Sequence, residues 1–386
     1  MRLSQTIFIL SGKFADHFIR FGGYTPTPLS LKKLIAFGKV GSVQKSASFL
    51  AYELPVRLAN ILQEIHLLPE RLVRTPSASL VRRWYEQSFC ELMDFEKIEW
   101  DEKSLNQFNE ILASIRSRHT TVVETMAQGV MEMQGNYKTD IVTNNQVQYF
   151  LDRFYMMRIS IRMLLSQHLL MFGSELNKHR RYVGSIDPDC NVREILDDAH
   201  EDAKFLCEHY YSAAPEMEVR VHSVKVTKTT EDVSQVWNRA AYHVVKYYVS
   251  LPKHISDLGG GIPRSQMDLV FNYTYTTARQ AERCGEPSLS SMELGPPDQG
   301  TNAPMAGYGY GLPLSRLYAK YFNGDLILSS VEGYGTDAIV YLKRNAAEAD
   351  ELLPVFNRTS AKQYGSASIP VADWSNPHIT TGWRRN

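Results

Sequence analysis

Three glycine-rich motifs in the last third of the chain are the residues with the clearest capacity for chemistry. They read DLGGGIP at 257–263, GYGYGLP at 307–313 and GYGTDA at 333–338. Glycines cluster in this way where the backbone takes a positive φ or must approach a ligand closely. Backbone N–H groups freed by such turns, with a helix beginning behind them, form a cradle for phosphate. The acid that opens the first motif and the helix-like stretch 314–322 after the second predict a nucleotide site.

The competing interpretation is that these motifs are three unrelated structural turns. That interpretation does not account for their order together with the opening acid. It also leaves unexplained the segment 285–304, which is rich in Pro, Gly and Ser and lies between the first two motifs. A flexible loop in that position is placed like a lid over a nucleotide.

Most of the first half of the chain is predicted to be helical. Apolar residues recur at spacings of three and four across residues 28–211, as amphipathic helices require. Polar or proline breaks near residues 68–69, 101, 135–136 and 173–174 separate roughly four long helices. Helices of this number and length most simply form a bundle.

The hydrophobic period changes after a predicted linker at 184–188. Alternating apolar residues predict strands within 217–226, and later strands are expected at 326–330 and 338–342. Thr230-Glu231-Asp232 reads as the start of a helix that continues to Tyr248. Helices and strands around one sheet are typical of an α+β or α/β nucleotide domain.

The expected organisation therefore has four parts. Residues 1–27 are a candidate targeting segment, because basic and apolar residues alternate there, although Asp16 weakens that pattern. Residues 28–183 form the helical-bundle domain and 184–345 the nucleotide-binding domain, followed by a polar tail at 346–386. The expected fold class is α + α/β, an N-terminal four-helix bundle followed by an α/β sandwich.

Composition excludes several classes of protein. Lys plus Arg equals Asp plus Glu at 42 each, so no global field attracts nucleic acid. The four cysteines lie far apart without metal-ligand spacing, which argues against a zinc site or a secreted disulfide framework. No apolar run reaches the roughly eighteen residues that a membrane span needs.

The chain resembles the mitochondrial pyruvate dehydrogenase kinases, with the branched-chain ketoacid dehydrogenase kinases as close relatives. The resemblance covers residues 28–374. It is carried by ELPVRLANI at 53–61, TMAQG at 125–129, YFLDRFY at 149–155 and GYGYGLPLSRLYAKYF at 307–322. It implies the histidine-kinase-like ATP-binding fold and a protein serine kinase that uses ATP and Mg²⁺, with K⁺ as a further candidate ion.

The resemblance also implies how the motifs bind the nucleotide. Asp257 would accept a hydrogen bond from the adenine amino group, with Thr276 and Thr336 lining the site. Gly259 and Gly261 would let the backbone pass close to the nucleotide. The phosphates would lie at a helix N-terminus, wrapped by Gly307, Tyr308, Gly309, Tyr310, Gly311 and Leu312.

Three further groups of residues in the helical part match the family. His119 matches a histidine near the active site and is a candidate catalytic residue, although a hydrogen-bonded structural role is the alternative. Arg158 and Arg162 would line a pocket for pyruvate-like anions, unless they are salt-bridged arginines on a helix face. Leu34, Phe37 and Phe49 resemble the apolar site for the lipoyl domain, unless they belong to the ordinary core.

The resemblance implies partners and a location as well. The substrate would be the E1 component of pyruvate dehydrogenase, and the docking partner the lipoyl domain of the E2 core, in the mitochondrial matrix. Asp373-Trp374 resembles the tail motif through which these kinases pair, which implies a homodimer.

One part of the family pattern is missing. The family carries a glutamate as general base and, four residues later, an asparagine that holds Mg²⁺, on the helix before the first glycine motif. The helix expected at 230–248 has no such pair. Glu231 is the candidate replacement base, and Asn238 or Gln235 the candidate replacement metal ligand. The departure leaves two interpretations open: an active kinase, or a catalytically impaired relative that docks lipoyl domains or dimerises. A histidine kinase or ATPase of the wider superfamily is disfavoured, because the helical part lacks paired helices around a phospho-acceptor histidine.

Overall fold

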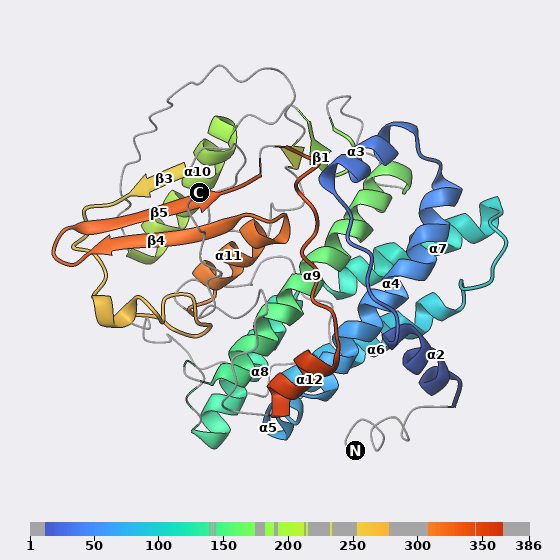
Figure 1. The fold of residues 1–386 in the computed structure, drawn as a ribbon, viewed down its shortest axis with the longest axis horizontal. Coiled ribbons are helices and arrows are strands. Elements are labelled where there is room, and N and C mark those ends of the chain that lie inside the picture. Colours follow the sequence, from blue (N-terminus) through green and yellow to red (C-terminus); the bar gives the residue numbers. More distant parts are fainter. Residues whose placement is uncertain are drawn as a thin grey trace.

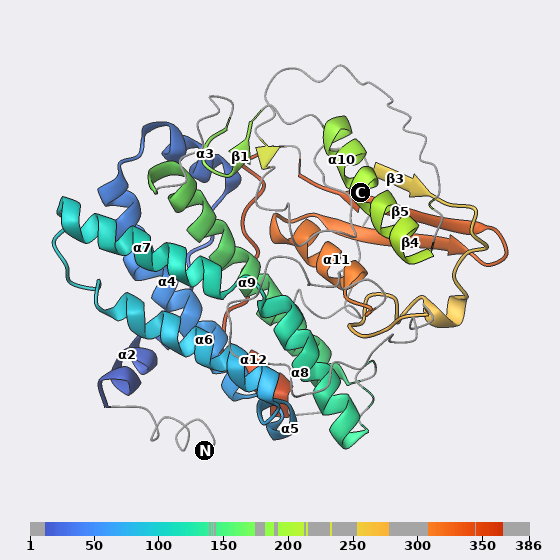
Figure 2. The same ribbon diagram turned by 180° about the vertical axis from the view of Figure 1, so that it is seen from behind.

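The protein is a mostly helical α+β structure in which long helices lie to one side of a small antiparallel sheet (Figure 1). The computed structural model describes residues 12–138, 140, 142, 144–173, 182–188, 192–211, 214, 232–233, 253–277, 308–343 and 345–365. The sheet lies at the opposite end of the molecule from α2 and α7, as both Figure 1 and the reverse view in Figure 2 show.

Eight helices precede the first strand in the described part of the chain. They are α2 (Gly12–Gly22), α3 (Leu31–Val40), α4 (Val43–His66), α5 (Glu70–Val73), α6 (Pro76–Met93), α7 (Glu102–Arg118), α8 (Val122–Tyr137) and α9 (Asn145–Phe172). Most begin at a residue whose side chain accepts a hydrogen bond from the first turn, as the N-cap rule predicts. These caps are Ser30, Ser42, Thr75, Asp101 and Asn144.

The two longest helices, α4 and α9, form the centre of the helical layer. Helix α4 packs against α2, α6 and α9, and α9 packs against α4, α7 and α11. Both are buried around most of their circumference, which is why their apolar residues extend beyond a single stripe. Phe18 and Phe21 of α2 join this core, so the chain is already part of the fold there.

The predicted helix boundaries hold near residues 68–69, 101, 135–136 and 173–174, but one further break was missed. Helix α7 ends at Arg118 and α8 begins at Val122, giving five long helices where roughly four were expected. The residues between contain neither Gly nor Pro, so the sequence gives no local signal. The break is stabilised from a distance, because Arg158 Nη2 on α9 donates to the carbonyl oxygens of His119 (3.1 Å) and Thr120 (3.2 Å).

The three-stranded sheet has the order β3-β5-β4, with β3 at Lys253–Ser256, β4 at Asp325–Val331 and β5 at Gly335–Tyr341. Both strand pairs are antiparallel, and Ile327 lies opposite Ile339. Helix α11 (Gly311–Tyr321) packs on β4. These strands and α11 confirm the elements predicted at 326–330, 338–342 and 314–322.

Two predictions between the helices and this sheet are wrong. The segment 184–188 is not a linker, because Ile186–Asp187 forms β1 with Ile186 fully buried. Strand β1 pairs with β2 (Asp232–Val233), so these two residues are not the first turn of a helix. Gln167 Oε1 fixes the turn by accepting hydrogen bonds from the N–H (2.9 Å) and Oγ (2.7 Å) of Ser185, a tertiary interaction that local composition does not reveal. Helix α10 (Val192–Tyr211) follows β1.

Several other expectations lie outside the described residues. They are the strands within 217–226, the remainder of the helix expected to reach Tyr248, the lid-like segment 285–304, and Asp373-Trp374.

The C-terminal segment 345–365, which was expected to belong to a polar tail, is a structured part of the helical layer. It runs back along the helices and ends in α12 (Arg358–Gly365), drawn in orange and red in Figure 1. Its Glu351 pairs with buried Arg57 of α4, and its Tyr364 donates to the carboxylate of Glu64. Arg153 of α9 in turn donates to the carbonyl oxygen of Val355 (2.8 Å). The segment therefore completes the polar contacts of buried charges on α4 and α9.

Candidate functional site

The first glycine motif follows directly from the end of β3. The Asp257 N–H donates to the carbonyl oxygen of Thr336 (3.0 Å), which extends the pairing of β3 with β5 by one residue. The Asp257 side chain is exposed, and its Oδ1 accepts a hydrogen bond from the Gly259 N–H (2.7 Å). The acid is thus held at the edge of the sheet by its own turn and faces solvent, where it can bind a polar ligand.

The first and third glycine motifs pack against each other through their backbones. Gly261 has φ +72°, and a Cβ placed on it would lie 2.1 Å from the carbonyl oxygen of Val331. A Cβ on Gly335 would lie 1.9 Å from the carbonyl oxygen of Asp257. No side chain fits at either position, so both glycines are required for the two turns to meet.

A hydroxyl pair ties this double turn together. Ser330 Oγ accepts from the Ile262 N–H (2.6 Å) and lies 3.0 Å from Thr336 Oγ1. The carbonyl group of Thr336 therefore contacts Asp257. Its hydroxyl contacts Ser330, which in turn binds the first motif. The structure brings together the predicted residues Asp257, Gly261 and Thr336. Gly259 is less constrained, because a Cβ placed on it would approach only the side chain of Asp257.

The second glycine motif leads into α11. Gly307 lies outside the described residues and Tyr308 is exposed. Gly309 has φ +75°, and a Cβ there would lie 2.3 Å from the carbonyl oxygen of Tyr275, which precedes the predicted site residue Thr276. The second motif thus packs on the backbone of residues 274–275 rather than on the other two glycine turns.

The start of α11 presents two backbone donors. Tyr310 is the N-cap, and its side chain makes no capping hydrogen bond. Leu314 N–H donates to the Tyr310 carbonyl oxygen (3.2 Å), and Pro313 has no N–H. The N–H groups of Gly311 and Leu312 therefore point beyond the helix end, at the positive pole of its dipole, where an anion is favoured.

Tyr310 takes part in this turn through its backbone alone. Its side chain is 2% exposed, with ring centroids 5.3 Å from Tyr273 and 6.3 Å from Tyr155. This aromatic cluster anchors the glycine turn to α9. Burial raises the pKa of Tyr310 well beyond its ordinary value, so the phenol stays neutral.

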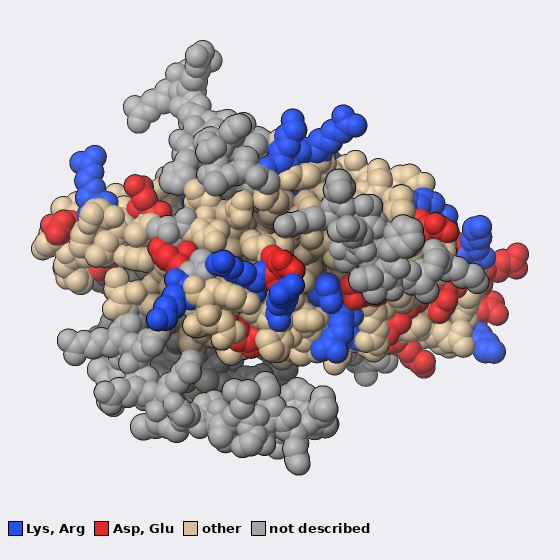
Figure 3. Space-filling view, turned by 90° about the horizontal axis from the view of Figure 1, so that it is seen from below, with Lys and Arg blue, Asp and Glu red and all other residues tan. Residues whose placement is uncertain are grey.

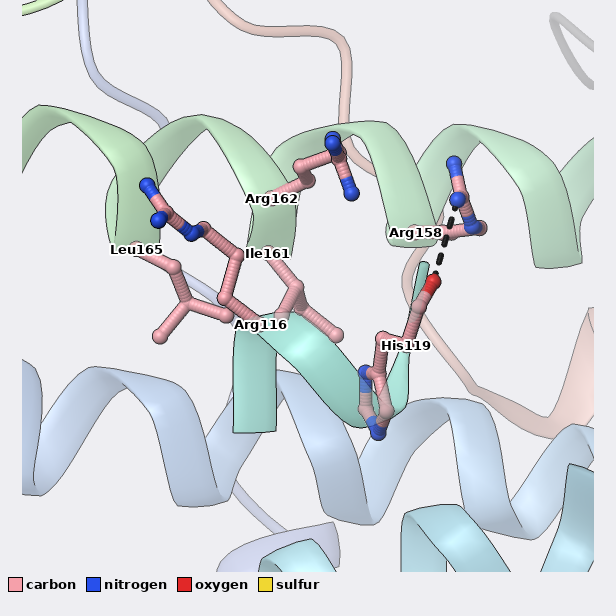
Figure 4. A pocket seen from close by; sticks show the side chains of 6 residues that line it. All are labelled: Arg116, His119, Arg158, Ile161, Arg162 and Leu165. Atoms are coloured by element: carbon pink, nitrogen blue, oxygen red, sulfur yellow. Dashed lines mark hydrogen bonds between the residues drawn. The ribbon is translucent and has the colours of Figure 1, made fainter. Parts of the chain in front are cut away.

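A second site lies within the helical layer, between the end of α7 and the middle of α9 (Figure 4). It is a small cavity lined by Arg116, His119, Arg158, Ile161, Arg162 and Leu165. Burial and the neighbouring Arg158 lower the pKa of Arg162, because these cations repel each other in a poorly solvated space. Two buried atoms here, Arg158 Nε and the Tyr85 hydroxyl, find no hydrogen-bond partner in the described part of the chain. The site thus has an excess of donors and positive charge.

His119 belongs to this cavity and is not among the residues gathered around the glycine motifs. Its ring stacks on Tyr85 with centroids 4.5 Å apart, and its Nε2 lies 3.0 Å from Ser88 Oγ. In Figure 4 its carbonyl oxygen faces Arg158 while the ring points away from α9. Burial and then Arg158 lower the pKa of His119 to about 3, so the imidazole is neutral at physiological pH. The other candidate catalytic residue, Glu231, and the candidate metal ligand Asn238 lie outside the described residues.

A third site is an apolar groove of about 550 Å³ between α3, α4 and α9. All three apolar residues predicted for a lipoyl site, Leu34, Phe37 and Phe49, line it. A hydrogen-bonded chain forms part of the lining, in which His168 Nδ1 lies 2.7 Å from Ser46 Oγ and its Nε2 lies 2.8 Å from Asn109 Oδ1. Burial lowers the pKa of His168 to about 4, so this hydrogen-bonded chain is uncharged at neutral pH.

Sequence reasoning missed several residues of these sites. Arg116 and Leu165 could have been found from spacing, since they lie three residues from His119 and Arg162 respectively on the same helices. Tyr85 and Glu351 carry no such signal, because their contacts come from distant parts of the chain.

Figure 3 shows Lys and Arg side chains interspersed with Asp and Glu on the face that it presents. Within the described residues no group of three or more His, Cys, Asp or Glu could hold a metal ion, and no helix is long and apolar enough to cross a membrane.

Comparison with known proteins identifies the family. A family model described as mitochondrial branched-chain alpha-ketoacid dehydrogenase kinase matches residues 28–187. The chain is 43% identical to the mitochondrial pyruvate dehydrogenase (acetyl-transferring) kinase of Drosophila melanogaster, over 92% of this chain and 91% of that protein. It is 44% identical to isozyme 3 of Homo sapiens, over 93% and 92%, and 45% identical to isozyme 4 of Rattus norvegicus, over 92% and 90%. The family predicted from the motifs is thereby confirmed, and the names of these relatives agree with the expected mitochondrial location. The chain belongs to the family of mitochondrial pyruvate dehydrogenase kinases.

Proposed function

We propose that this chain is a protein serine kinase that transfers phosphate from Mg-ATP to the E1 component of pyruvate dehydrogenase, and so inactivates it, in the mitochondrial matrix. The four-helix bundle (28–183) and the histidine-kinase-like ATP-binding sandwich (184–345) are the domains that this function requires. Asp257 and Thr336 bind the adenine, and the N–H groups of Gly311 and Leu312 bind phosphate oxygens. Mg²⁺, when bound, neutralises phosphate charge.

The observation that carries the proposal is the backbone contact between the first and third glycine motifs. Glycines 261 and 335 have no space for a Cβ, and their packing fixes an exposed acid beside a threonine at the end of a strand. A turn kept free of side chains beside a single oriented acid suits recognition of a flat base with an exocyclic amino group. The positive pole of the helix dipole at the N-terminus of α11 suits the polyphosphate of the same ligand.

The test is phosphate transfer from Mg-ATP to E1, measured with the lipoyl-bearing core present and with E1 alone. We expect transfer by the unaltered chain and its loss in Asp257→Ala. Asp268→Ala is the matched control, because Asp268 is also an exposed acid on the same stretch of chain. Transfer that survives Asp257→Ala at the unaltered rate would contradict the assignment of the nucleotide site.

The second candidate function is a catalytically impaired relative that binds lipoyl domains or dimerises. The missing Glu/Asn pair favours it, because a lost general base costs about 10²–10⁴-fold in rate. In this case E1 would remain unphosphorylated while binding to the lipoyl core persisted. An active enzyme would instead require Glu231 as base and Asn238 or Gln235 as metal ligand.

The remaining partners would bind in the apolar groove and in the small cavity. The lipoyl domain of the E2 core would insert its lipoyl group into the groove beside Phe37 and Phe49, where Lys33 is the cationic lining residue. A pyruvate-like anion would enter the cavity at Arg158 and Arg162, where donors exceed acceptors. The cavity is small, so the anion has to displace a guanidinium on entry.

The homodimer belongs to the same proposal. On β4, Ile327 and Val331 point to the face opposite Leu326, and both are exposed, as is Tyr341 of β5. Apolar side chains in neighbouring positions on one sheet face are typical of an interaction surface. A second copy of the chain is the occupant that the family resemblance and the tail motif imply.

A further inference from the structure

One side-chain amide of α9 binds both polar backbone groups of a single residue in the turn 272–275, which follows the first glycine motif. Gln148 Oε1 accepts the N–H of Tyr273 (2.7 Å), and Gln148 Nε2 donates to the carbonyl oxygen of Tyr273 (3.1 Å). The Tyr273 hydroxyl donates to Oδ1 of Asp152 (3.0 Å), which lies four residues after Gln148 and therefore on the same side of α9. One helix thus holds a buried tyrosine at its backbone and at the tip of its ring. We refer to these three residues as the Tyr273 clamp.

The turn that the Tyr273 clamp holds is strained. Thr274 has φ +68°, a left-handed conformation that a β-branched residue rarely adopts. Its Oγ1 is buried without a hydrogen-bond partner in the described part of the chain. A strained residue persists only where its surroundings over-determine the backbone. Here the backbone is determined by the two hydrogen bonds from Gln148 to Tyr273, and by the bond from Asn272 Nδ2 to the carbonyl oxygen of Val142 (3.0 Å).

The Tyr273 clamp meets the start of α11 through two contacts. The first is the close packing of Gly309 on the strained turn, where a Cβ would lie 2.3 Å from the carbonyl oxygen of Tyr275 and 2.7 Å from the carbonyl carbon of Thr274. The second is the aromatic contact between Tyr273 and Tyr310, the N-cap of α11, whose ring centroids are 5.3 Å apart. The position of the helix start therefore depends on the position of Tyr273.

The adenine side of the proposed nucleotide site is held by different contacts. Asp257 and Thr336 are fixed by the pairing of β3 with β5 and by the hydroxyl of Ser330. These hydrogen bonds are made within the sheet and its glycine turns. A displacement of the Tyr273 clamp should therefore move the backbone donors at the start of α11 and leave the adenine contacts in place.

We propose that Gln148 is a positioning residue for the phosphates of the nucleotide, acting through Tyr273. It holds the turn on which Gly309 packs, so that the N–H groups of Gly311 and Leu312 point at the phosphate oxygens. A glutamine suits this task because its amide both accepts and donates, as the N–H and carbonyl groups of one residue require. The inference deepens the proposed function and rests on it, namely on phosphate binding at the start of α11.

The test compares the affinities of the full chain for ATP and for adenosine, measured by calorimetry in the presence of Mg²⁺. Gln148→Ala removes both hydrogen bonds to the backbone of Tyr273. We expect its Kd for ATP to rise about tenfold or more, as for the loss of one charged hydrogen bond to phosphate, and its Kd for adenosine to stay within about twofold. Tyr273→Phe removes only the bond to Asp152, and we expect its Kd to rise about threefold for ATP alone.

Gln146→Ala is the matched control. Gln146 is the same residue type two positions earlier on α9 and is likewise half-buried, but its Nε2 donates to the carbonyl oxygen of Tyr364 in α12 (3.1 Å). This variant should bind ATP and adenosine as the unaltered chain does. Thermal unfolding of both glutamine variants measures their stability, so that a loss of ATP affinity is separated from partial unfolding.

Three results would overturn the inference while leaving the proposed function intact. They are an unchanged Kd for ATP in Gln148→Ala, an equal weakening of ATP and adenosine in that variant, and an equal weakening of ATP in both glutamine variants. If Gln148→Ala does not fold, Tyr273→Phe decides, and unaltered ATP binding there would contradict the inference. An unaltered chain that binds ATP no more tightly than adenosine would instead contradict phosphate binding at the start of α11, and the proposed function with it.

Discussion

The surroundings of His119 and His168 suppress the protonation near neutral pH for which histidine is known. Burial lowers the pKa of His119 to about 3 and that of His168 to about 4. Both rings stay neutral and serve as hydrogen-bond partners of serines, Ser88 and Ser46. At physiological pH neither can deliver a proton, so the chemistry available to them is hydrogen bonding and stacking.

Acid should destabilise the protein through these two rings. An unfolded histidine binds a proton near pH 6.5, whereas the folded rings do so only near pH 3 and 4, so stability falls as the pH drops below about 6.5. Each ring costs about 2 kcal/mol between pH 8 and pH 5. Unfolding in urea at both pH values should show His168→Gln losing about 2 kcal/mol less than the unaltered chain. His17→Gln, at a half-exposed position on α2, is the control and should keep the full loss.

Arg162 should govern the response to small carboxylates. Its charge lacks solvation and lies beside Arg158, so a bound anion relieves the repulsion. Pyruvate should raise the melting temperature of the unaltered chain, and Arg162→Met should weaken pyruvate binding about tenfold or more, as expected for loss of one charged hydrogen bond. Arg83→Met, on the exposed face of α6, should bind pyruvate normally. Equal weakening in both variants would show that pyruvate binds elsewhere.

Among the elements, those defined by local pattern were predictable and those defined by distant contacts were not. Strands β4 and β5 and helix α11 follow from alternation and from the glycine motif, and the structure has them within three residues of the predicted bounds. The break between α7 and α8 depends on Arg158 about forty residues away. The same applies to the C-terminal segment, whose Glu351 finds its partner Arg57 at a sequence separation of 294.

The sites divide in the same way. Asp257 and Thr336 belong to glycine motifs that carry their own backbone geometry, whereas the groove residues were predicted from the family resemblance alone. Tyr310 shows the limit of prediction from a motif. The motif predicts the position of its backbone but does not reveal that its side chain is buried in the core. Ser185 and Ile186 were read as a linker since small and polar residues dominate 184–188, yet Gln167 draws them into the interior.

The C-terminal segment should prove essential for the stability of the helical layer. Glu351→Gln removes the charge that neutralises Arg57 and should lower the free energy of unfolding by about 3 kcal/mol, because breaking a buried ion pair leaves a charge uncompensated. Glu348→Gln is the control, at an exposed position three residues earlier, and should cost less than about 0.5 kcal/mol. Chemical denaturation measures both. Similar losses in the two variants would mean that the buried pair contributes no more than a surface charge.

At the scale of the whole molecule, we expect the open face of the sheet to be the surface through which two copies of the chain associate. Ile327 of β4 lies opposite Ile339 of β5, and α11 packs on β4. Apolar side chains left exposed on a sheet favour assembly over solvation.

Charge placed on this face should separate the dimer. Ile327→Lys together with Val331→Lys should convert a dimer to a monomer in analytical ultracentrifugation, because two buried charges per subunit would have no partners in the interface. Ile19→Lys, at an exposed apolar position on α2, should leave the dimer intact. A dimer that persists in the double variant would place the contact on another surface.

The pairing of residues 29–32 with 346–351 has a consequence for how the chain is made. A growing polypeptide leaves the ribosome from its N-terminus, and leading domains usually fold first. Here Arg57 and Glu64 acquire their last partners only when residues 351 and 364 have emerged. Helices made early in synthesis must therefore wait for residues 351 and 364 before their buried charges are paired. A protein whose helical layer stays incomplete until then is well suited to being threaded through a membrane pore before it becomes compact.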